Sequence, residues 1–473
     1  MKFLPLTAAL LIAGTLSSRG HAKFEGPWPD LPANEAKRIE SAANLKATAP
    51  PLRPRKLLVF SKGIEANHKS TPHGMRAFEA LAKHSGAFEV VQTYDPEMLT
   101  AERLKAFDAV LFNNSNRLDY LRDESIQEGL SSFVREGKGF IGIHAATTNF
   151  IERWNSDWPE GATMLGGVFD GHPWHEKVTL QIEEPGHPLT HAFADPSFEV
   201  QDEIYQFCAP YSRENVRVLV SLDKRKTPIA HKHLSQINRR DLDFPVSWIR
   251  SYGEGRVFYC SLGHDPHIFW NPIVLHHFLD GIQYALGDLE APDATSKTRD
   301  QIQSTASGVL EIAERLGAIS EREQTPFGDE LKSRIVSTMT SLSSLNETDR
   351  RALEQTFLSF LQTTSAKQNK QFVLKQLSKV ATEESIQTLS NLLYSEDTFA
   401  AALQILENNP SGDATLAIAV ALYKLDESNL PKLIKAVGKR GYKEPVEKLK
   451  EYLTHENEEV KHAARSALEK LDF

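Results

Sequence analysis

Cysteine is scarce in this chain of 473 residues. Its two cysteines, Cys208 and Cys260, are more than fifty residues apart, so they cannot form a disulfide framework and lack the spacing of a metal site. Basic side chains are also outnumbered, with 54 Lys and Arg against 63 Asp and Glu, which gives a formal charge of −9. A chain of this charge offers no basic surface for a nucleic-acid backbone, and it lacks the series of long apolar segments of a multi-span membrane protein. We therefore expect no disulfide dependence, no nucleic-acid partner and no transmembrane anchor.

Histidine, in contrast, is abundant and unevenly distributed. The chain has 17 histidines, and 14 of them lie between His68 and His277. With 40% hydrophobic and 25% charged residues, the composition is that of a soluble globular protein, and the length predicts two or three domains. The concentration of histidine indicates that the chemistry lies in the first of these domains.

Residues 1–22 have the pattern of a secretory signal peptide. A lysine precedes an apolar run that is too short to remain in a bilayer, and small residues stand three and one positions before a cut after Ala22. A buried N-terminal helix is the alternative interpretation. We expect a bacterial protein that is periplasmic or secreted. Residues 23–54 contain six prolines and are expected to form an extended lead-in.

Residues 55–288 alternate between short β-rich runs and amphipathic helical stretches. This order predicts right-handed crossovers and a mostly parallel sheet covered on both faces, with ligands bound beyond the carboxyl ends of the strands. The expected strands are 56–60, 88–91, 108–112, 139–143, 177–182, 216–222 and 256–260, and the expected helices are 74–84, 125–135 and 274–286.

Residues 289–473 follow a different pattern. Tryptophan and cysteine are absent there, and apolar residues recur at spacings of three and four, which predicts amphipathic helices. From residue 385 onward the helices are short and joined by tight polar turns. This pattern is typical of a stacked helical-hairpin array of the HEAT type, and a compact helical bundle is the alternative.

Polar residues follow three of the expected strands. His68 comes after the first strand, Asn113 and Asn114 after the third, and His144 after the fourth. In a parallel sheet these strand ends meet at one edge, so the side chains are expected to converge. Asparagine side chains can bind sugar hydroxyls, but they are equally common as turn residues, and both interpretations of Asn113 and Asn114 stay open.

His144 stands in the sharpest local motif of the chain, residues 142–146 (GIHAA). A strand that stops abruptly before small side chains has the geometry of a nucleophile elbow, which exposes one residue at the top of the sheet. The exposed residue here is a histidine, which suits a general base or a metal ligand better than an acyl-transfer nucleophile. We find no Ser-His-Asp or Cys-His arrangement, so acyl hydrolysis is not expected.

Further histidines and carboxylates lie beside later expected strands. Two histidines, three residues apart, share a loop with glycine and proline, and an acidic pair and a His-Asp pair follow. If they converge with His144 they could form a zinc-type site or an acid–base network. The residues concerned are His144, His172, His175, Glu203, His264 and Asp265, of which His144, His172, His175 and His264 are the candidate metal ligands.

Six motifs, taken in order, resemble the ThuA-like (trehalose utilisation) family over residues 55–288. They are 68–74 (HKSTPHG), 142–147 (GIHAAT), 166–173 (GGVFDGHP), 202–205 (DEIY), 245–248 (PVSW) and 255–265 (GRVFYCSLGHD). The resemblance implies a parallel-sheet fold similar to flavodoxin and the class I glutamine amidotransferases, in which the elbow has lost its cysteine. This agrees with His144 at the elbow position. Residues 151–155 (IERWN) depart from the family pattern and leave the substrate open.

The resemblance also implies a role in sugar catabolism. Some relatives act beside sugar dehydrogenases that make 3-keto-glycosides, and some hold a metal, so zinc or another divalent metal is the implied cofactor and no nucleotide cofactor is expected. The site residues carried over from the family are His68, His144, His172, Glu203 and His264.

The preferred hypothesis is an exported enzyme, a lyase, hydrolase or isomerase, acting on glycosides or 3-keto-glycosides. A metal or imidazolium polarises a carbonyl, and a histidine or Glu203 removes the adjacent proton. The catalytic candidates are His144, Glu203, His264 and Asp265, and the substrate-binding candidates are His68, Asn113, Asn114, Trp174 and Trp248.

Two other functions stay open. One is a non-catalytic carbohydrate-binding module, in which tryptophans stack on sugar rings: Trp154, Trp158, Trp174 and Trp270. The other is a scaffold whose helical region binds a protein partner.

Overall fold

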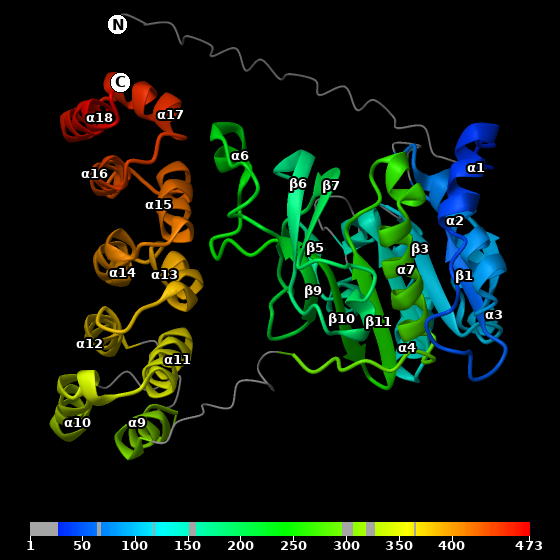
Figure 1. Cartoon of the computed structure of the whole chain (residues 1–473), viewed down its shortest axis with the longest axis horizontal. Coiled ribbons are helices and arrows are strands. Elements are labelled where there is room, and N and C mark those ends of the chain that lie inside the picture. The colour runs from blue at the N-terminus through cyan, green and yellow to red at the C-terminus, as the bar shows by residue number, and fades with distance from the viewer. Residues whose placement is uncertain are drawn as a thin grey trace, which may run out of the picture.

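The computed structural model describes residues 27–63, 68–116, 119–150, 158–295, 306–317, 327–363 and 366–473. The predicted signal peptide, residues 1–22, lies outside the described residues. Figure 1 shows two regions, an α/β domain and an array of helices, in the order that the sequence predicts. The predicted fold class, α/β followed by all-α, is confirmed.

The α/β domain is built on a nine-stranded sheet of order β2-β1-β3-β4-β11-β10-β9-β6-β7. Its first five strands are parallel, as predicted, so their carboxyl ends lie at one edge. The strands of this half are β2 (Glu89–Thr93), β1 (Lys56–Phe60), β3 (Ala109–Asn113), β4 (Gly139–Ile143) and β11 (Gly255–Cys260).

The other half of the sheet is antiparallel. The sequence predicted a mostly parallel sheet and did not indicate this second half. The change of direction occurs at the tight turn that joins β10 to β11, because two strands joined by so short a connection can only run antiparallel. Gly253 in this turn has a φ of 60°, which glycine adopts without strain. The strands of this half are β10 (Pro245–Tyr252), β9 (Arg217–Leu222), β6 (Trp174–Ile182) and β7 (Ser197–Ile204).

Helices cover both faces of the parallel half because its strands are apolar on both sides. Leu57 and Val59 of β1 join one core with α2 (Thr71–Ser85) and α7 (Pro272–Ala285), whereas Leu58 packs into a second core with α4 (Glu124–Arg135). Successive side chains of a strand point to opposite faces, so one apolar run supplies both cores. The shorter elements are η1 (Pro96–Leu99), α3 (Ala101–Leu104), η2 (Asp119–Arg122), η3 (His144–Phe150), α5 (Pro159–Leu165), β5 (Val168–Phe169), η5 (Pro188–Thr190), β8 (Phe207–Cys208), α6 (His231–Gln236) and η6 (Pro266–Trp270).

The lead-in is not extended throughout, contrary to our expectation for residues 23–54. Ala33–Ala42 forms helix α1, which begins directly after Pro32 and packs on α2. Proline has no N–H to lose at a helix start, so the prolines bound this helix rather than preclude it. Glu40 of α1 pairs with Arg76 of α2, and Ile39 of α1 is buried in the same core as Ala77 of α2.

The C-terminal helices stack in two columns, which favours the repeat array over the compact bundle (Figure 1). Most helices one or two positions apart along the chain contact each other, and the column of α9, α11, α13, α15 and α17 faces the α/β domain. No helix in the described ranges is both long and apolar enough to cross a membrane. The helices are α9 (Ser307–Gly317), α10 (Asp329–Thr340), α11 (Glu347–Thr363), α12 (Lys367–Leu377), α13 (Ile386–Leu392), α14 (Glu396–Asn408), α15 (Gly412–Lys424), α16 (Leu430–Arg440), α17 (Val446–Glu451) and α18 (Glu458–Lys470), with the single turns η7 (Leu342–Ser344), η8 (Glu383–Ser385) and η9 (Tyr452–Thr454).

The two regions touch through the segment 224–241, which contains α6. The Nδ1 atom of His231 in α6 lies 2.5 Å from the hydroxyl of Tyr423 in α15. Nearby, the guanidinium of Arg240 lies over the ring of Tyr394, 4.4 Å from its centroid, and its carbonyl accepts a hydrogen bond from Ser390. The helical array therefore contacts a segment that is linked to β6, because Nε2 of His233 in α6 lies 2.6 Å from the carboxylate of Glu176.

Candidate functional site

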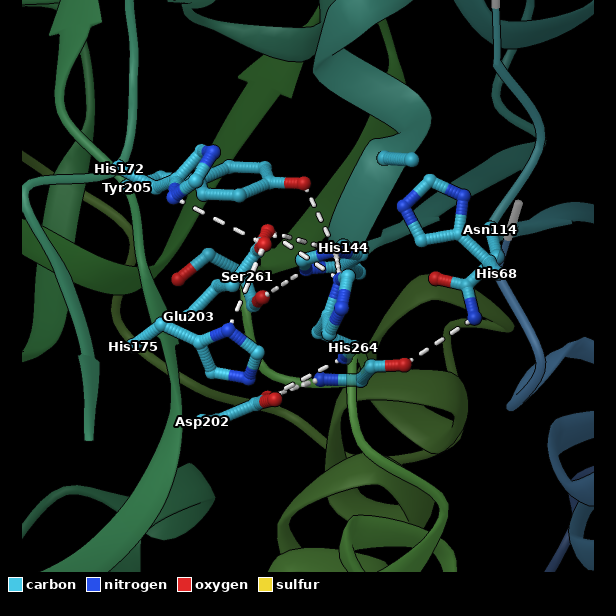
Figure 2. A network of polar contacts seen from close by, with 12 residues as sticks. His68, Asn114, His144, His172, His175, Asp202, Glu203, Tyr205, Ser261 and His264 are labelled. Carbon is cyan, nitrogen blue, oxygen red and sulfur yellow. Dashed lines mark hydrogen bonds and ion pairs between the residues drawn. The ribbon is translucent and has the colours of Figure 1, made fainter. Parts of the chain in front are cut away.

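The candidate site lies at the carboxyl edge of the parallel strands, where the sequence places it. Figure 2 shows side chains from several separate segments pointing toward one another there. His144 follows β4, His264 follows β11, and His68 precedes α2 in the connection after β1. The antiparallel half supplies the opposite wall through Glu203 and Tyr205, at the end of β7.

His144 occupies a strained elbow and is completely buried. Its φ is 49°, in the left-handed region, which costs a non-glycine residue roughly 1–2 kcal/mol. Gly263 packs against it, and a Cβ at Gly263 would lie 3.2 Å from the Cβ of His144. The elbow that the sequence predicts is therefore present, but its side chain points into a closed cluster rather than into solvent.

The protonation of His144 follows from its partners. Its Nδ1 lies 2.6 Å from the carbonyl oxygen of Ser261, which can only accept, so Nδ1 carries the proton and Nε2 presents a lone pair. The hydroxyl of Tyr205 donates to Nε2 at 2.7 Å. Burial, together with the charge of His68, holds the pKa of His144 well below its usual value, so the ring is neutral at neutral pH.

His68, His144 and His264 form what we call the inner group. Each offers a ligand atom within 4.8 Å of the other two, and their ring centroids are 5.0–5.4 Å apart. The Nδ1 of His264 lies 3.3 Å from Nε2 of His144, and the side-chain amide of Asn116 lies 2.9 Å from Nδ1 of His68. The structure thus confirms that three distant loops converge.

Glu203 links the inner group to the open side of the site. Its Oε2 lies 3.2 Å from Nδ1 of His264 and 3.7 Å from Nε2 of His144, whereas its Oε1 lies 3.7 Å from Nδ1 of His172. Burial acts to raise the pKa of Glu203, but the hydrogen bond to His264 and the charges of the surrounding histidines lower it to about 2. Burial likewise acts to lower the pKa of His264, and the interaction with Glu203 outweighs it and raises that pKa.

A second set of side chains lies at the mouth of the site, and we call His175 and Asp265 the outer pair. Nε2 of His175 lies 3.3 and 3.4 Å from the two carboxylate oxygens of Asp265. The side chain of His175 is 43% exposed and that of Asp265 22% exposed. Together with His264 they form a second group whose ligand atoms lie within 4.8 Å of one another, while His172 belongs to neither group.

Asp202 fixes the loop that carries His264 and Asp265. Its carboxylate accepts the backbone N–H groups of Gly263 at 2.6 Å, Asp265 at 2.9 Å and His264 at 3.3 Å. Burial raises the pKa of Asp202 to about 7 despite these hydrogen bonds. Asp202 therefore acts on the site through the backbone and not by contact with a ligand.

The prediction that Trp174 and Trp248 bind substrate is wrong. Both side chains are 0% exposed. Trp174 stacks on His233 and packs against Phe244, and the indole N–H of Trp248 donates to the carbonyl of Leu165. A sugar ring cannot reach either indole, because large aromatic side chains close the core around both.

The other tryptophans proposed for stacking give no better platform. Trp158 is buried against Phe150, and Trp154 lies outside the described residues. Trp270 is partly exposed, but the guanidinium of Arg38 lies over its ring at 4.2 Å. The tryptophans thus lend no support to the stacking that the non-catalytic module requires.

Asn113 and Asn114 brace the site rather than line it. The amide of Asn113 donates to Ser61 and to the carbonyl of Thr71, and its side chain fits against Gly74, where a Cβ would clash. The amide of Asn114 donates to Ser70 and to the carbonyl of Gly263. With both residues at most 3% exposed, the turn interpretation holds, and the substrate-binding prediction for them is wrong in this structure.

Three contributors were missed as separate site residues in the sequence: Tyr205, Ser261 and Asn116. Tyr205 directly follows β7, two residues after Glu203, and residues two apart in extended chain share a face, so this signal was available. Ser261 acts through its carbonyl, which no side-chain pattern can reveal. Asn116 is recognised only once the connections after β1 and β3 are seen side by side.

The inner group and Glu203 fit a divalent transition metal such as zinc. Two ligands of a tetrahedral zinc ion, each about 2.1 Å from it, lie about 3.4 Å apart. The nitrogen and oxygen atoms of His144, His264 and Glu203 lie 3.2–3.7 Å apart, close to this spacing. The carbonyl that holds the proton on the far nitrogen of His144 is the usual outer partner of a metal-bound imidazole.

The fold and the clustered histidines define an α/β domain with a histidine–carboxylate site at its carboxyl edge. Residues 56–285 match the ThuA family, described as trehalose utilisation, so this part of the chain is a ThuA-family domain. The resemblance deduced from the six motifs is confirmed, and the family suggests a carbohydrate-related role. No curated protein matches the chain.

Solved structures with similarity to the chain include three kinds of protein. A ThuA-like protein of Bacteroides uniformis is 23% identical, with a TM-score of 0.41 over 50% of this chain and 92% of its own. A cytoplasmic protein of Salmonella typhimurium is 11% identical, with a TM-score of 0.33 over 49% of this chain and 98% of its own. A β-galactosidase of Bacillus circulans is 12% identical, with a TM-score of 0.28 over 51% of this chain but only 31% of its own length.

Proposed function

We propose that the chain is an exported enzyme of carbohydrate catabolism that acts on glycosides or 3-keto-glycosides, with a divalent metal held by His68, His144 and His264. The family supports the carbohydrate role. The observation that carries the proposal is the inner group together with Glu203, three imidazoles and one carboxylate with the spacing of metal ligands. Such a set is costly to assemble in a buried place unless it binds something.

Glu203 is the proposed base. With a pKa of about 2 it is ionised at neutral pH, and its Oε1 faces the open side of the site. A bound divalent cation would supply Lewis-acid polarisation of the substrate carbonyl, which makes the neighbouring C–H bond more acidic. A weak but permanently ionised base then suffices.

The proposed step is an elimination. Glu203 takes the proton from the carbon beside the ketone, and the electron pair of that C–H bond forms the enolate. The enolate then collapses to a carbon–carbon double bond and expels the glycosidic oxygen, which takes a proton from an imidazolium at the mouth of the site. His172 is placed for this, because its side chain is 45% exposed and Nδ1 lies beside Oε1 of Glu203.

The same residues also support a metal-free mechanism as a second candidate. The neutral His144 and the more basic His264 lie 3.3 Å apart, and adjacent groups whose pKa values are driven in opposite directions are suited to act as base and acid. Full activity after exhaustive chelation would favour this candidate.

The test uses the full purified chain with 3-keto-glucosides and glucosides as substrates. We expect product formation and bound metal in the wild-type protein, and loss of both in His68→Gln. His191→Gln, which changes an exposed histidine of the same domain, serves as the matched control. Saturable sugar binding without any product would contradict the enzyme and favour the non-catalytic module.

Export is tested separately. The N-terminal pattern supports cleavage after Ala22 and a periplasmic or secreted location. N-terminal sequencing of the protein recovered from outside the cytoplasm should begin at Lys23, and an intact N-terminus retained with the cytoplasmic fraction would contradict export.

A further inference from the structure

The outer pair is built for a ligand and not only placed near one. His175 on β6 lies directly opposite Glu203 on β7 in the antiparallel register, so strand pairing fixes its position. Cross-strand neighbours of this kind lie on the same face of the sheet. The backbone N–H of Asp265 is held at 2.9 Å by Asp202. Both members of the outer pair are thus fixed by their backbones, while their side chains stay accessible.

The carboxylate of Asp265 does not make the helix-capping hydrogen bond that its position in the chain favours. Asp265 is the N-cap residue of η6, a position at which an aspartate side chain usually accepts a backbone N–H of the first turn. No such bond is present, and the carboxylate faces His175 instead. The side chain of Asp265 therefore lies at the mouth of the site, beside His175, and does not cap η6.

Glu203 presents one oxygen to each group. Oε2 faces the inner group, while Oε1 lies 3.9 Å from Nδ1 of His175. Within the described residues, the ion-pair partners of Glu203 and Asp265 are all histidines, with no lysine or arginine. A lysine or arginine would neutralise these carboxylates permanently, whereas a histidine can lose its proton and become a ligand.

We propose that the outer pair, with Oε1 of Glu203, binds a second divalent metal ion next to the inner one. This inference rests on the proposed inner metal site, and it describes the protein before the reaction, because Oε1 of Glu203 must leave the second ion in order to accept the substrate proton. Nitrogen and carboxylate ligands suit zinc and related transition metals, and a carboxylate between two ions about 3.5–4 Å apart is a common bridge. The ion would lie on the exposed side, where positions remain for two neighbouring oxygens of a sugar.

The experiment counts metal ions on the full chain. Protein stripped with a chelator is titrated with Zn²⁺, and bound metal is measured after gel filtration. We expect two ions per wild-type chain, one in Asp265→Asn and one in His175→Gln, with the remaining ion bound as tightly as the tighter ion of the wild type. His191→Gln should retain two. Co²⁺ substitution gives a second readout, because two neighbouring Co²⁺ ions couple magnetically and a single one does not.

The outcomes separate this inference from the proposed function. One ion in the wild-type protein that survives Asp265→Asn and is lost in His68→Gln would overturn the second site and leave the inner one standing. No bound metal in any variant would overturn both. Two ions in both outer variants would also overturn the proposal, because the second ion would then lie elsewhere.

Discussion

The inner group and the outer pair use the same residue types in opposite surroundings. His144 is fully buried, and its tautomer is fixed by a carbonyl on one side and a hydroxyl on the other, whereas His175 is nearly half exposed and pairs with the carboxylates of Glu203 and Asp265. The inner group comes from the ends of parallel strands, and the opposite wall comes from the antiparallel half of the sheet. Burial therefore fixes protonation in one group, and exposure keeps the other open to substrate, with Glu203 in contact with both.

The largest effect is expected where the two groups meet. Glu203→Gln keeps the size of the side chain but removes the charge that faces both groups and the proposed base. We expect turnover of a 3-keto-glucoside to fall by about a thousandfold. Steady-state kinetics of the full chain measure this. Activity within tenfold of wild type would show that Glu203 is neither the base nor the link between the groups.

The next largest effect is expected at His277, which tests whether burial keeps a histidine neutral, as we argue for His144. His277 lies outside the site and is also fully buried, with Nδ1 at 2.7 Å from the carbonyl of Leu189 and Nε2 at 2.8 Å from Ser247. Burial lowers the pKa of His277 from 6.5 to about 4. Between these values the unfolded chain binds a proton that the folded chain does not.

The free energy of unfolding should therefore fall as the pH drops from 6.5 toward 4, by about 3 kcal/mol from this residue. Above pH 6.5 the contribution is fully present. Denaturant titrations of the wild type and His277→Gln across this range measure the difference in slope. Parallel curves for the two proteins would contradict the assignment.

A smaller effect is expected from Tyr205→Phe, which removes the hydroxyl at Nε2 of His144 and leaves the ring in place. That hydroxyl and an inner metal ion would compete for the same Nε2 lone pair of His144. We therefore expect the inner ion to bind about fivefold more tightly in the variant, the net contribution of one hydrogen bond, and the outer ion to be unchanged, measured by competition with a chromophoric chelator. A weaker inner ion would contradict this competition.

The smallest effect on the site is expected from Gln206, a buried residue that ties the outer wall to the segment held by the helical array. Its side chain donates to the carbonyl of Gln236 and accepts from the N–H of Asn238, and its backbone N–H donates to the carbonyl of Gly171. Gln206→Met should destabilise the fold by about 1–3 kcal/mol and weaken the outer ion a fewfold. An inner ion that weakens more than the outer one would contradict this coupling.

The parallel half of the fold could be predicted because its signals are local. Apolar runs such as 56–60 and 139–143 are strands by composition, and the small residues after His144 mark an abrupt strand end. Once those strands are parallel, convergence of His68, His144 and His264 follows from geometry. The helix α1 was missed because prolines were taken to exclude a helix rather than to bound one.

The rest of the site depends on pairing between distant segments. The position of His175 opposite Glu203 follows from the register of β6 and β7, which their sequences do not specify on their own. Trp174 illustrates the other error, because its neighbours in sequence suggest a site loop, while alternation along β6 turns its side chain into the core. The roles of Ser261 and Asp202 rest on backbone contacts that only the folded chain shows.

The most direct test of the central claim is anomalous X-ray scattering at the zinc absorption edge, from crystals of the full chain grown with Zn²⁺. The account predicts a strong peak bounded by His68, His144, His264 and Glu203. A map in which the side chains are ordered and this position holds no anomalous peak would contradict it.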